Sequence, residues 1–173
     1  MKKGMLPVIL LLISGFGLHA QDQYAKNGGY LELGGNGGLY SLNYERFLSP
    51  DFSIRAGFAS YSGESWWGDE ETSVTTFPLL GNYFYGNGSN RLELGAGILL
   101  GSKKVKSGWG EEMNRSSTIF DLTAVVGYRY QKPAGGFIFR AGFTPFYALS
   151  GGEDAYPDEG FTPSGGISFG YAF

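Results

Sequence analysis

The segment P-S-G-G-I-S-F-G-Y-A-F, from Pro163 to Phe173, carries the clearest fold signal in the sequence. Ile167, Phe169, Tyr171 and Phe173 alternate in it with small or polar residues. Successive side chains of a β-strand point to opposite faces, so one face of this segment is apolar and the other is small. In a soluble barrel the apolar face looks inward, whereas in a membrane barrel it looks outward to lipid.

The same alternation recurs along the chain and predicts a sheet of eight strands in one domain. Thirty Gly, twelve Tyr and fourteen Phe among 173 residues suit a curved sheet with bulky side chains on one face. Pro78, inside the fourth segment, would suit a β-bulge. The predicted strands span residues 29–36, 39–48, 52–62, 72–85, 91–103, 116–131, 137–149 and 163–173.

The predicted connections alternate in length. Those after the second, fourth and sixth strands are tight, whereas residues 63–71, 104–115 and 150–162 form longer polar loops. The first connection, G-G-N-G-G at 34–38, is the exception and reads as a tight turn. An even strand number with short turns at one end and longer loops at the other is typical of outer-membrane barrels. The short turns and both termini are then expected in the periplasm.

The first twenty residues have the features of a secretory signal peptide. Lys2 and Lys3 precede an apolar stretch over residues 5–18, and the small Ala20 follows. The stretch is too short for a membrane-spanning helix. We therefore expect a signal peptide at 1–20, cleaved after Ala20, and a barrel domain at 21–173.

With its terminal Phe173 and alternating aromatic residues, the chain resembles the small eight-stranded outer-membrane barrels. This group holds the transmembrane domain of outer membrane protein A and outer membrane protein X. The resemblance implies an all-β, eight-stranded antiparallel up-and-down transmembrane β-barrel with a polar, plugged interior. It also implies that outer-membrane lipid surrounds the protein, and that the barrel assembly machinery reads the last strand through Ile167, Phe169, Tyr171 and Phe173.

The face opposite the apolar one carries four acidic and four basic residues. An eight-stranded barrel has room inside only for side chains, and charges buried there must be paired to offset desolvation. We therefore expect an ion-pair network that fills the barrel and leaves no open pore; a proton relay or narrow channel is the alternative. The predicted members are Glu32, Glu45, Arg55, Arg91, Glu93, Asp121, Arg129 and Arg140.

Residues suited to catalysis are scarce. The one histidine is His19, within the predicted signal peptide, and there is no cysteine. The barrel enzymes that this chain resembles in size, lipid A deacylases and palmitoyltransferases, use a catalytic histidine. A carboxylate pair or a Ser–Lys dyad stays open, although no spacing singles one out. We expect no enzymatic activity, no cofactor and no metal site.

The predicted long loops combine aromatic and acidic residues. Such residues can anchor a partner protein, or the tryptophans can belong to the interfacial aromatic belt while the acids are solvated. The negative net charge, −3, argues against nucleic acid as a partner. The loop candidates are Trp66, Trp67, Asp69, Glu70, Glu71, Trp109, Glu153, Asp154 and Tyr156.

The sequence thus predicts a monomeric outer-membrane barrel with a structural or surface-interaction role. A loop-mediated adhesin is the first alternative, and a barrel enzyme or narrow transport channel is the second. The third is a secreted soluble barrel of lipocalin type, which would bury the apolar face of the sheet.

Overall fold

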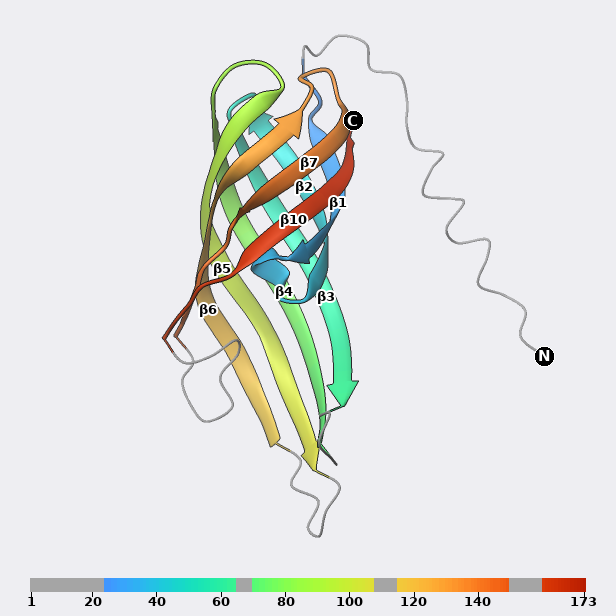
Figure 1. Cartoon of the computed structure of the whole chain (residues 1–173), viewed down its shortest axis with the longest axis vertical. Coiled ribbons are helices and arrows are strands. Elements are labelled where there is room, and N and C mark those ends of the chain that lie inside the picture. Colours follow the sequence, from blue (N-terminus) through green and yellow to red (C-terminus); the bar gives the residue numbers. More distant parts are fainter. Residues whose placement is uncertain (1–23, 65–69, 108–114, 150–159) are drawn as a thin grey trace, which may run out of the picture.

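The alternating segments of the sequence form long antiparallel strands (Figure 1). The computed structural model describes residues 24–64, 70–107, 115–149 and 160–173. Its strands are β1 (Asn27–Gly34), β2 (Tyr40–Ser49), β3 (Phe52–Glu64), β4 (Glu70–Tyr85), β5 (Asn90–Ser107), β6 (Arg115–Gln131), β7 (Gly136–Phe143), β8 (Phe146–Ala148), β9 (Phe161–Thr162) and β10 (Gly165–Ala172). A 3₁₀ turn, η1 (Gly35–Gly37), links β1 to β2. No helix among these residues is long and apolar enough to cross a membrane.

Eight of the strands pair side by side into a closed barrel. The order round the barrel is β1, β2, β3, β4, β5, β6, β7 and β10, and β10 pairs back with β1. β8 continues β7 beyond Pro145, and β9 leads into β10 across Pro163. Proline has no N–H to donate to a ladder, so each break falls where a proline interrupts one long strand. The predicted eight-stranded antiparallel barrel is therefore confirmed.

The strands are tilted relative to the barrel axis, because each strand is staggered along its length relative to the next. A row of neighbouring residues that starts at Leu100 of β5 passes through Phe77, Phe58 and Leu42 on the adjoining strands. It continues round the barrel and returns to β5 at Asn90. A barrel closed with such a stagger has strands tilted by about 35–45° to its axis, and an eight-stranded one has an interior just wide enough for side chains.

The apolar face of the sheet points outward and the polar face points inward. Leu94 and Tyr171 are 38% and 61% exposed, whereas Glu93 and Arg140, on the opposite face, are 1% and 4% exposed. The predicted polar interior is therefore confirmed. This orientation contradicts the lipocalin-type alternative, which requires the apolar face to be buried.

The barrel wall is much taller on one side than on the other. β4, β5 and β6 contain 16, 18 and 17 residues, whereas β1 contains 8. The hairpin of β1 and β2 ends near the middle of the molecule, while β3 to β6 continue well beyond it (Figure 1). The short turns after β2, β4 and β6 lie at the opposite end, where the Asn27 N–H donates to the Phe173 carbonyl oxygen at 2.9 Å.

Some strand boundaries differ from the prediction. β1 begins earlier and ends earlier than the predicted 29–36, because residues 35–37 turn away from the sheet. β5 runs on to Ser107, into a segment predicted as loop. The expected bulge at Pro78 is wrong: the β3–β4 register is the same on both sides of it, and Pro78 still pairs with Leu99 of β5.

At the seam where β10 pairs with β1, the two strands pack so closely that one position has room only for glycine. A Cβ added to Gly170 would overlap the Gly29 carbonyl oxygen and the Tyr30 side chain, whereas one added to Gly29 meets no atom within 4 Å. Gly170→Ala should lower the free energy of unfolding by about 1–3 kcal/mol, as overpacking does. Gly29→Ala, the matched control, should change it by no more than about 0.5 kcal/mol. Urea unfolding of the refolded barrel measures both, and equal stabilities would contradict the seam geometry.

Candidate functional site

A chain of alternating charges crosses the interior of the barrel. Each member is buried, and each contacts the next through an ion pair, so that acids and bases balance. We call these six residues the ionic core. In order of contact they are Glu45, Arg129, Glu93, Arg140, Glu32 and Arg55.

The shortest contacts of the ionic core join Arg129 to Glu45 and Arg140 to Glu93. Arg129 Nη2 is 2.6 Å from Glu45 Oε2, and Arg129 Nη1 is 3.7 Å from Glu93 Oε2. Arg140 grips Glu93 with two parallel hydrogen bonds, from Nε to Oε2 at 2.7 Å and from Nη2 to Oε1 at 2.6 Å. Bidentate guanidinium–carboxylate pairs of this kind fix direction as well as distance.

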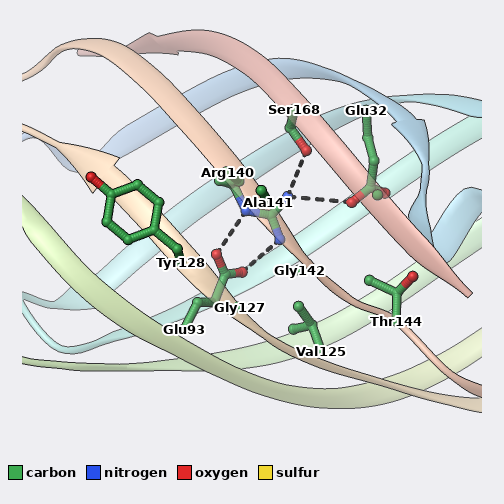
Figure 2. A pocket seen from close by; sticks show the side chains of 11 residues that line it. Glu32, Glu93, Val125, Gly127, Tyr128, Arg140, Ala141, Gly142, Thr144 and Ser168 are labelled. Carbon is green, nitrogen blue, oxygen red and sulfur yellow. Dashed lines mark hydrogen bonds and ion pairs between the residues drawn. The ribbon is translucent and has the colours of Figure 1, made fainter.

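Glu32 links the other end of the ionic core. Its Oε1 lies 3.4 Å from Nη1 of Arg140 and 3.4 Å from Nη1 of Arg55. Figure 2 shows Arg140 between Glu93 and Glu32, with the Ser168 hydroxyl as a further acceptor at 3.2 Å. A carboxylate shared by two guanidiniums keeps both cations close to a negative charge in a space that water scarcely enters.

All eight barrel strands contribute to this cluster. The six ions come from β2, β6, β5, β7, β1 and β3, and Asn82 of β4 and Ser168 of β10 complete the circle. Asn82 donates to Glu45 Oε1 at 3.1 Å, and the Ser53 hydroxyl donates to the same oxygen at 2.6 Å. The ionic core therefore joins strands that are not neighbours in the sheet.

Aromatic rings at the turn end of the barrel cover the arginines. The Arg129 guanidinium lies 4.8 Å from the Phe84 ring centroid and 5.3 Å from that of Phe47. Arg140 lies 4.7 Å from the Tyr30 ring. Such contacts supply favourable electrostatics without water. The alternating pattern predicted the charges inside, and it also places Tyr30, Phe47 and Phe84 on the inner face, two residues from Glu32, Glu45 and Asn82. The rings were missed because aromatic residues were expected on the outer face.

The side chains of the ionic core are closely packed. The cavity beside Arg140, lined also by Glu32, Glu93, Thr144 and Ser168, has a volume of about 10 Å³ (Figure 2). That is room for about one water molecule. The arrangement is thus suited to holding the strands in register and sealing the barrel.

The first connection adds a second seal: it is a tight turn, as predicted, but it folds inward, which the sequence did not indicate. η1 folds into the lumen and Asn36 is fully buried. Its amide nitrogen donates to Thr123 Oγ1 at 2.6 Å and to the Ala124 carbonyl oxygen at 2.9 Å, across the barrel on β6. Arg55 donates to the Asn36 side-chain oxygen, so η1 is tied to the ionic core.

Glycine is required where η1 approaches the ionic core. Gly35 has φ +77°, and a Cβ there would overlap the Glu32 carboxyl group. The five-residue G-G-N-G-G sequence is therefore the signal that could have identified an inward turn. It was not decisive, because glycine clusters also form exposed turns.

Two of the eight predicted interior residues lie apart from the ionic core. Asp121 is buried on the inner face of β6. Arg91 lies at the turn end, where its Nη1 is 3.9 Å from Asp51 Oδ1. Sequence reasoning identified all six members of the ionic core, but it did not separate them from these two.

Most of the predicted loop residues lie outside the described residues, as does the predicted signal peptide. These loop residues are Trp66, Trp67, Asp69, Trp109, Glu153, Asp154 and Tyr156. Glu70 and Glu71 are not in a loop, because β4 begins at Glu70. Glu71 lies 3.7 Å from Lys106 Nζ on β5, so the ladder continues beyond the position where the sequence predicted its end.

The C-terminal segment forms the closing strand. β10 pairs with β1 on one side and β7 on the other, and Ile167, Phe169, Tyr171 and Phe173 are exposed on the outer surface. The Phe169 and Phe139 rings lie 5.4 Å apart on that surface. These side chains are available to lipid or to another protein.

Comparison with solved structures gives the same fold. No family model and no curated protein matches the sequence. The N-terminal β-barrel domain of Pseudomonas aeruginosa OprF is 18% identical with a TM-score of 0.59, covering 86% of this chain and 99% of that domain. Neisserial surface protein A is 13% identical with a TM-score of 0.56, covering 87% of this chain and 96% of that structure. The chain therefore has the fold of the small eight-stranded outer-membrane barrels.

The ionic core predicts an asymmetric response to mutation. Arg140→Met leaves Glu93 and Glu32 without a shared cation and should cost roughly 3–5 kcal/mol of stability. Replacing both partners, as Arg140→Met with Glu93→Leu, should recover much of that loss, because no charge of the bidentate pair is then left uncompensated. Asp51→Asn, at an exposed acid, is the control. Urea titration of the unmodified protein, the single variants Arg140→Met and Glu93→Leu and the double variant gives the coupling energy, and additive losses would contradict the ionic core.

Proposed function

We propose that this protein is an integral outer-membrane β-barrel with a structural or surface-interaction role and no open pore. The observation that carries the proposal is a continuous apolar belt on the outside of a barrel whose charges are sealed inside. Leu42, Leu94, Leu122 and Phe143, from four different strands, are all 38–62% exposed on this belt. Exposed apolar surface on this scale marks contact with a membrane or a partner protein.

The belt ends abruptly on the tall side of the barrel, at the end away from the short turns (Figure 1). Leu100 of β5 pairs with Phe77 and Phe120, and the next outward residue, Ser102, pairs with Thr75 and Thr118. The outward face thus changes from three apolar residues to three hydroxyls within one step of the ladder. This change is expected where the wall leaves hydrocarbon for the headgroup region.

The height of the belt suits a bilayer. It runs along β5 from Leu92 to Leu100. At about 3.3 Å per residue and a tilt of about 40°, this length corresponds to a height on the order of 20 Å, close to the apolar band of about 25 Å in outer-membrane barrels. Tyr83, Tyr85 and Tyr128 are exposed at the edge of the belt nearest the short turns, where an aromatic girdle is expected.

These features support an orientation with the turns and both termini in the periplasm and the tall wall outside the cell. We further propose a monomer that is surrounded by lipid and recognised by the barrel assembly machinery through β10. A non-enzymatic role is supported by the sequence of residues 21–173, which contains neither histidine nor cysteine.

Adhesion is the second candidate function, and the tall wall favours it. β2 pairs with β3 only up to Phe58, so among the described residues Ala59–Glu64 has β4 as its one partner strand. An edge that projects beyond the apolar belt can pair with an extended segment of another protein. Deletion of residues 65–69, beyond the last β3–β4 pairs, should reduce adherence of cells displaying the protein to an immobilised extracellular-matrix protein; unchanged adherence would count against this role.

The membrane proposal predicts the fractionation of the protein. It should remain with the outer membrane after carbonate extraction, because insertion into lipid removes the apolar surface of the belt from water. It should also migrate faster on a denaturing gel before boiling than after, since a closed barrel stays compact in detergent. Recovery in the soluble periplasmic or secreted fraction, with a single gel mobility, would refute the proposal.

The sealed interior predicts the absence of a pore. Purified protein reconstituted in planar bilayers should give no large, stable conductance, since the ionic core and η1 fill the lumen. Protein that has been heat-denatured and not refolded is the control for contaminating channels. A large steady conductance from the native barrel, abolished by heating, would replace the sealed-barrel proposal with the transport alternative.

A further inference from the structure

A hollow of about 170 Å³ lies at the turn end of the barrel. It shares no residue with the small cavity in the ionic core. A Cβ added to Gly88, in its wall, would meet no atom within 4 Å, so this part of the wall borders open space. Its lining includes Pro50, Asp51, Asn87, Gly88, Arg91 and Gln131.

Arg91 is the cation of this hollow, and its hydrogen-bonding capacity is only partly used. Its side chain is 9% exposed, and its Nη1 donates to the Pro50 carbonyl oxygen at 2.5 Å. Its Nε has no hydrogen-bond partner among the described residues. A guanidinium carries five N–H groups in a planar fork, so the contacts with Pro50 and Asp51 use only part of the donor capacity of Arg91.

Protein carboxylates do not neutralise Arg91 well. The ionic core is balanced within itself, so none of its acids is left over for Arg91. The acid in contact, Asp51, lies 3.9 Å away and is 59% exposed, and such pairs contribute little. Arg91 and Arg129 also lie 4.9 Å and 4.8 Å from the same Phe84 ring, so the nearest buried neighbour of Arg91 beyond that ring is another cation.

We propose that this hollow binds one small oxyanion, a carboxylate or a phosphate group, through Arg91. The planar fork of a guanidinium matches both groups. Gln131 adds a polar wall: its Oε1 accepts from Arg129 at 2.5 Å and 2.8 Å, which leaves its amide nitrogen as the donor for other partners. That the hollow faces the periplasm rests on the proposed function, whereas the binding chemistry does not.

Anion titration of the folded protein tests the site directly. In neutral detergent micelles, with chloride keeping the ionic strength constant, phosphate and acetate should each shift the NMR signals of the Arg91 Nε–H and of the Asn87 and Gly88 amides. The shifts should saturate. Arg91→Gln should weaken binding at least tenfold by the two amide signals, and Arg91→Lys, which keeps the charge but loses the fork, should weaken it less.

The control variant is Arg46→Gln. Arg46 is exposed on the outer surface at the same end of the barrel, where it donates to Asn27 Oδ1 at 2.6 Å, so its loss changes the net charge equally without touching the hollow. This variant should bind as the unmodified protein does. Heat-modifiable gel mobility shows that each variant is folded. Absence of saturable shifts, or equal shifts in Arg91→Gln, overturns the proposal.

Nanodiscs identify the source of the oxyanion. If a lipid headgroup supplies it, the Arg91-dependent shifts should appear in phosphatidylglycerol discs without added anion and be absent from phosphatidylcholine discs. If a free anion supplies it, they should need added phosphate or acetate in both. Shifts in the anionic discs that persist in Arg91→Gln count against the site. Failure to enter discs at all would overturn the membrane proposal, while the micelle titration would still decide the binding.

Discussion

Inside an eight-stranded barrel, every buried charge must find its counter-charge among side chains, because the lumen is too narrow to hold bulk water. Three carboxylates and three guanidiniums satisfy this requirement here by forming a single alternating chain from Glu45 to Arg55. Their neutrality as a group is what allows the interior to be both polar and closed. Removal of any inner member would leave two neighbours short of a partner.

The outside of the barrel follows from the same arrangement. With the polar face satisfied internally, the opposite face is free to be uniformly apolar, and it is so over the height of the belt. The sheet then continues on one side only, where β3 to β6 extend past the Leu100 row and carry hydroxyl and charged residues outward. The barrel therefore combines a closed, rigid body with an open-edged wall.

The two ends of the lumen are closed by different means. At the wall end, η1 is drawn inward by hydrogen bonds of Asn36 to β6 and to Arg55, and glycine at position 35 permits the close approach to Glu32. At the turn end, Phe47 and Phe84 cover Arg129, and Arg91 borders the hollow beyond them. A sealed centre and a polar mouth are thus compatible in one short barrel.

The number of strands and the division of their side chains between two faces were determined by the sequence alone, because a period of two residues, set by the pleat, fixes which side chains share a face. Which of the two faces points outward was decided by the structure, since a soluble and a membrane barrel share that period. The same period identified the charged interior residues, Glu93 and Arg140 among them. Which acid meets which base was decided only by the tertiary structure, since that depends on the stagger with which distant strands pair. The tertiary structure also decided the inward course of residues 35–37, which depends on acceptors on β6 across the lumen. It likewise decided the continuation of β5 to Ser107, because the backbone ladder with β4 and β6 forms whether or not the side chains are polar.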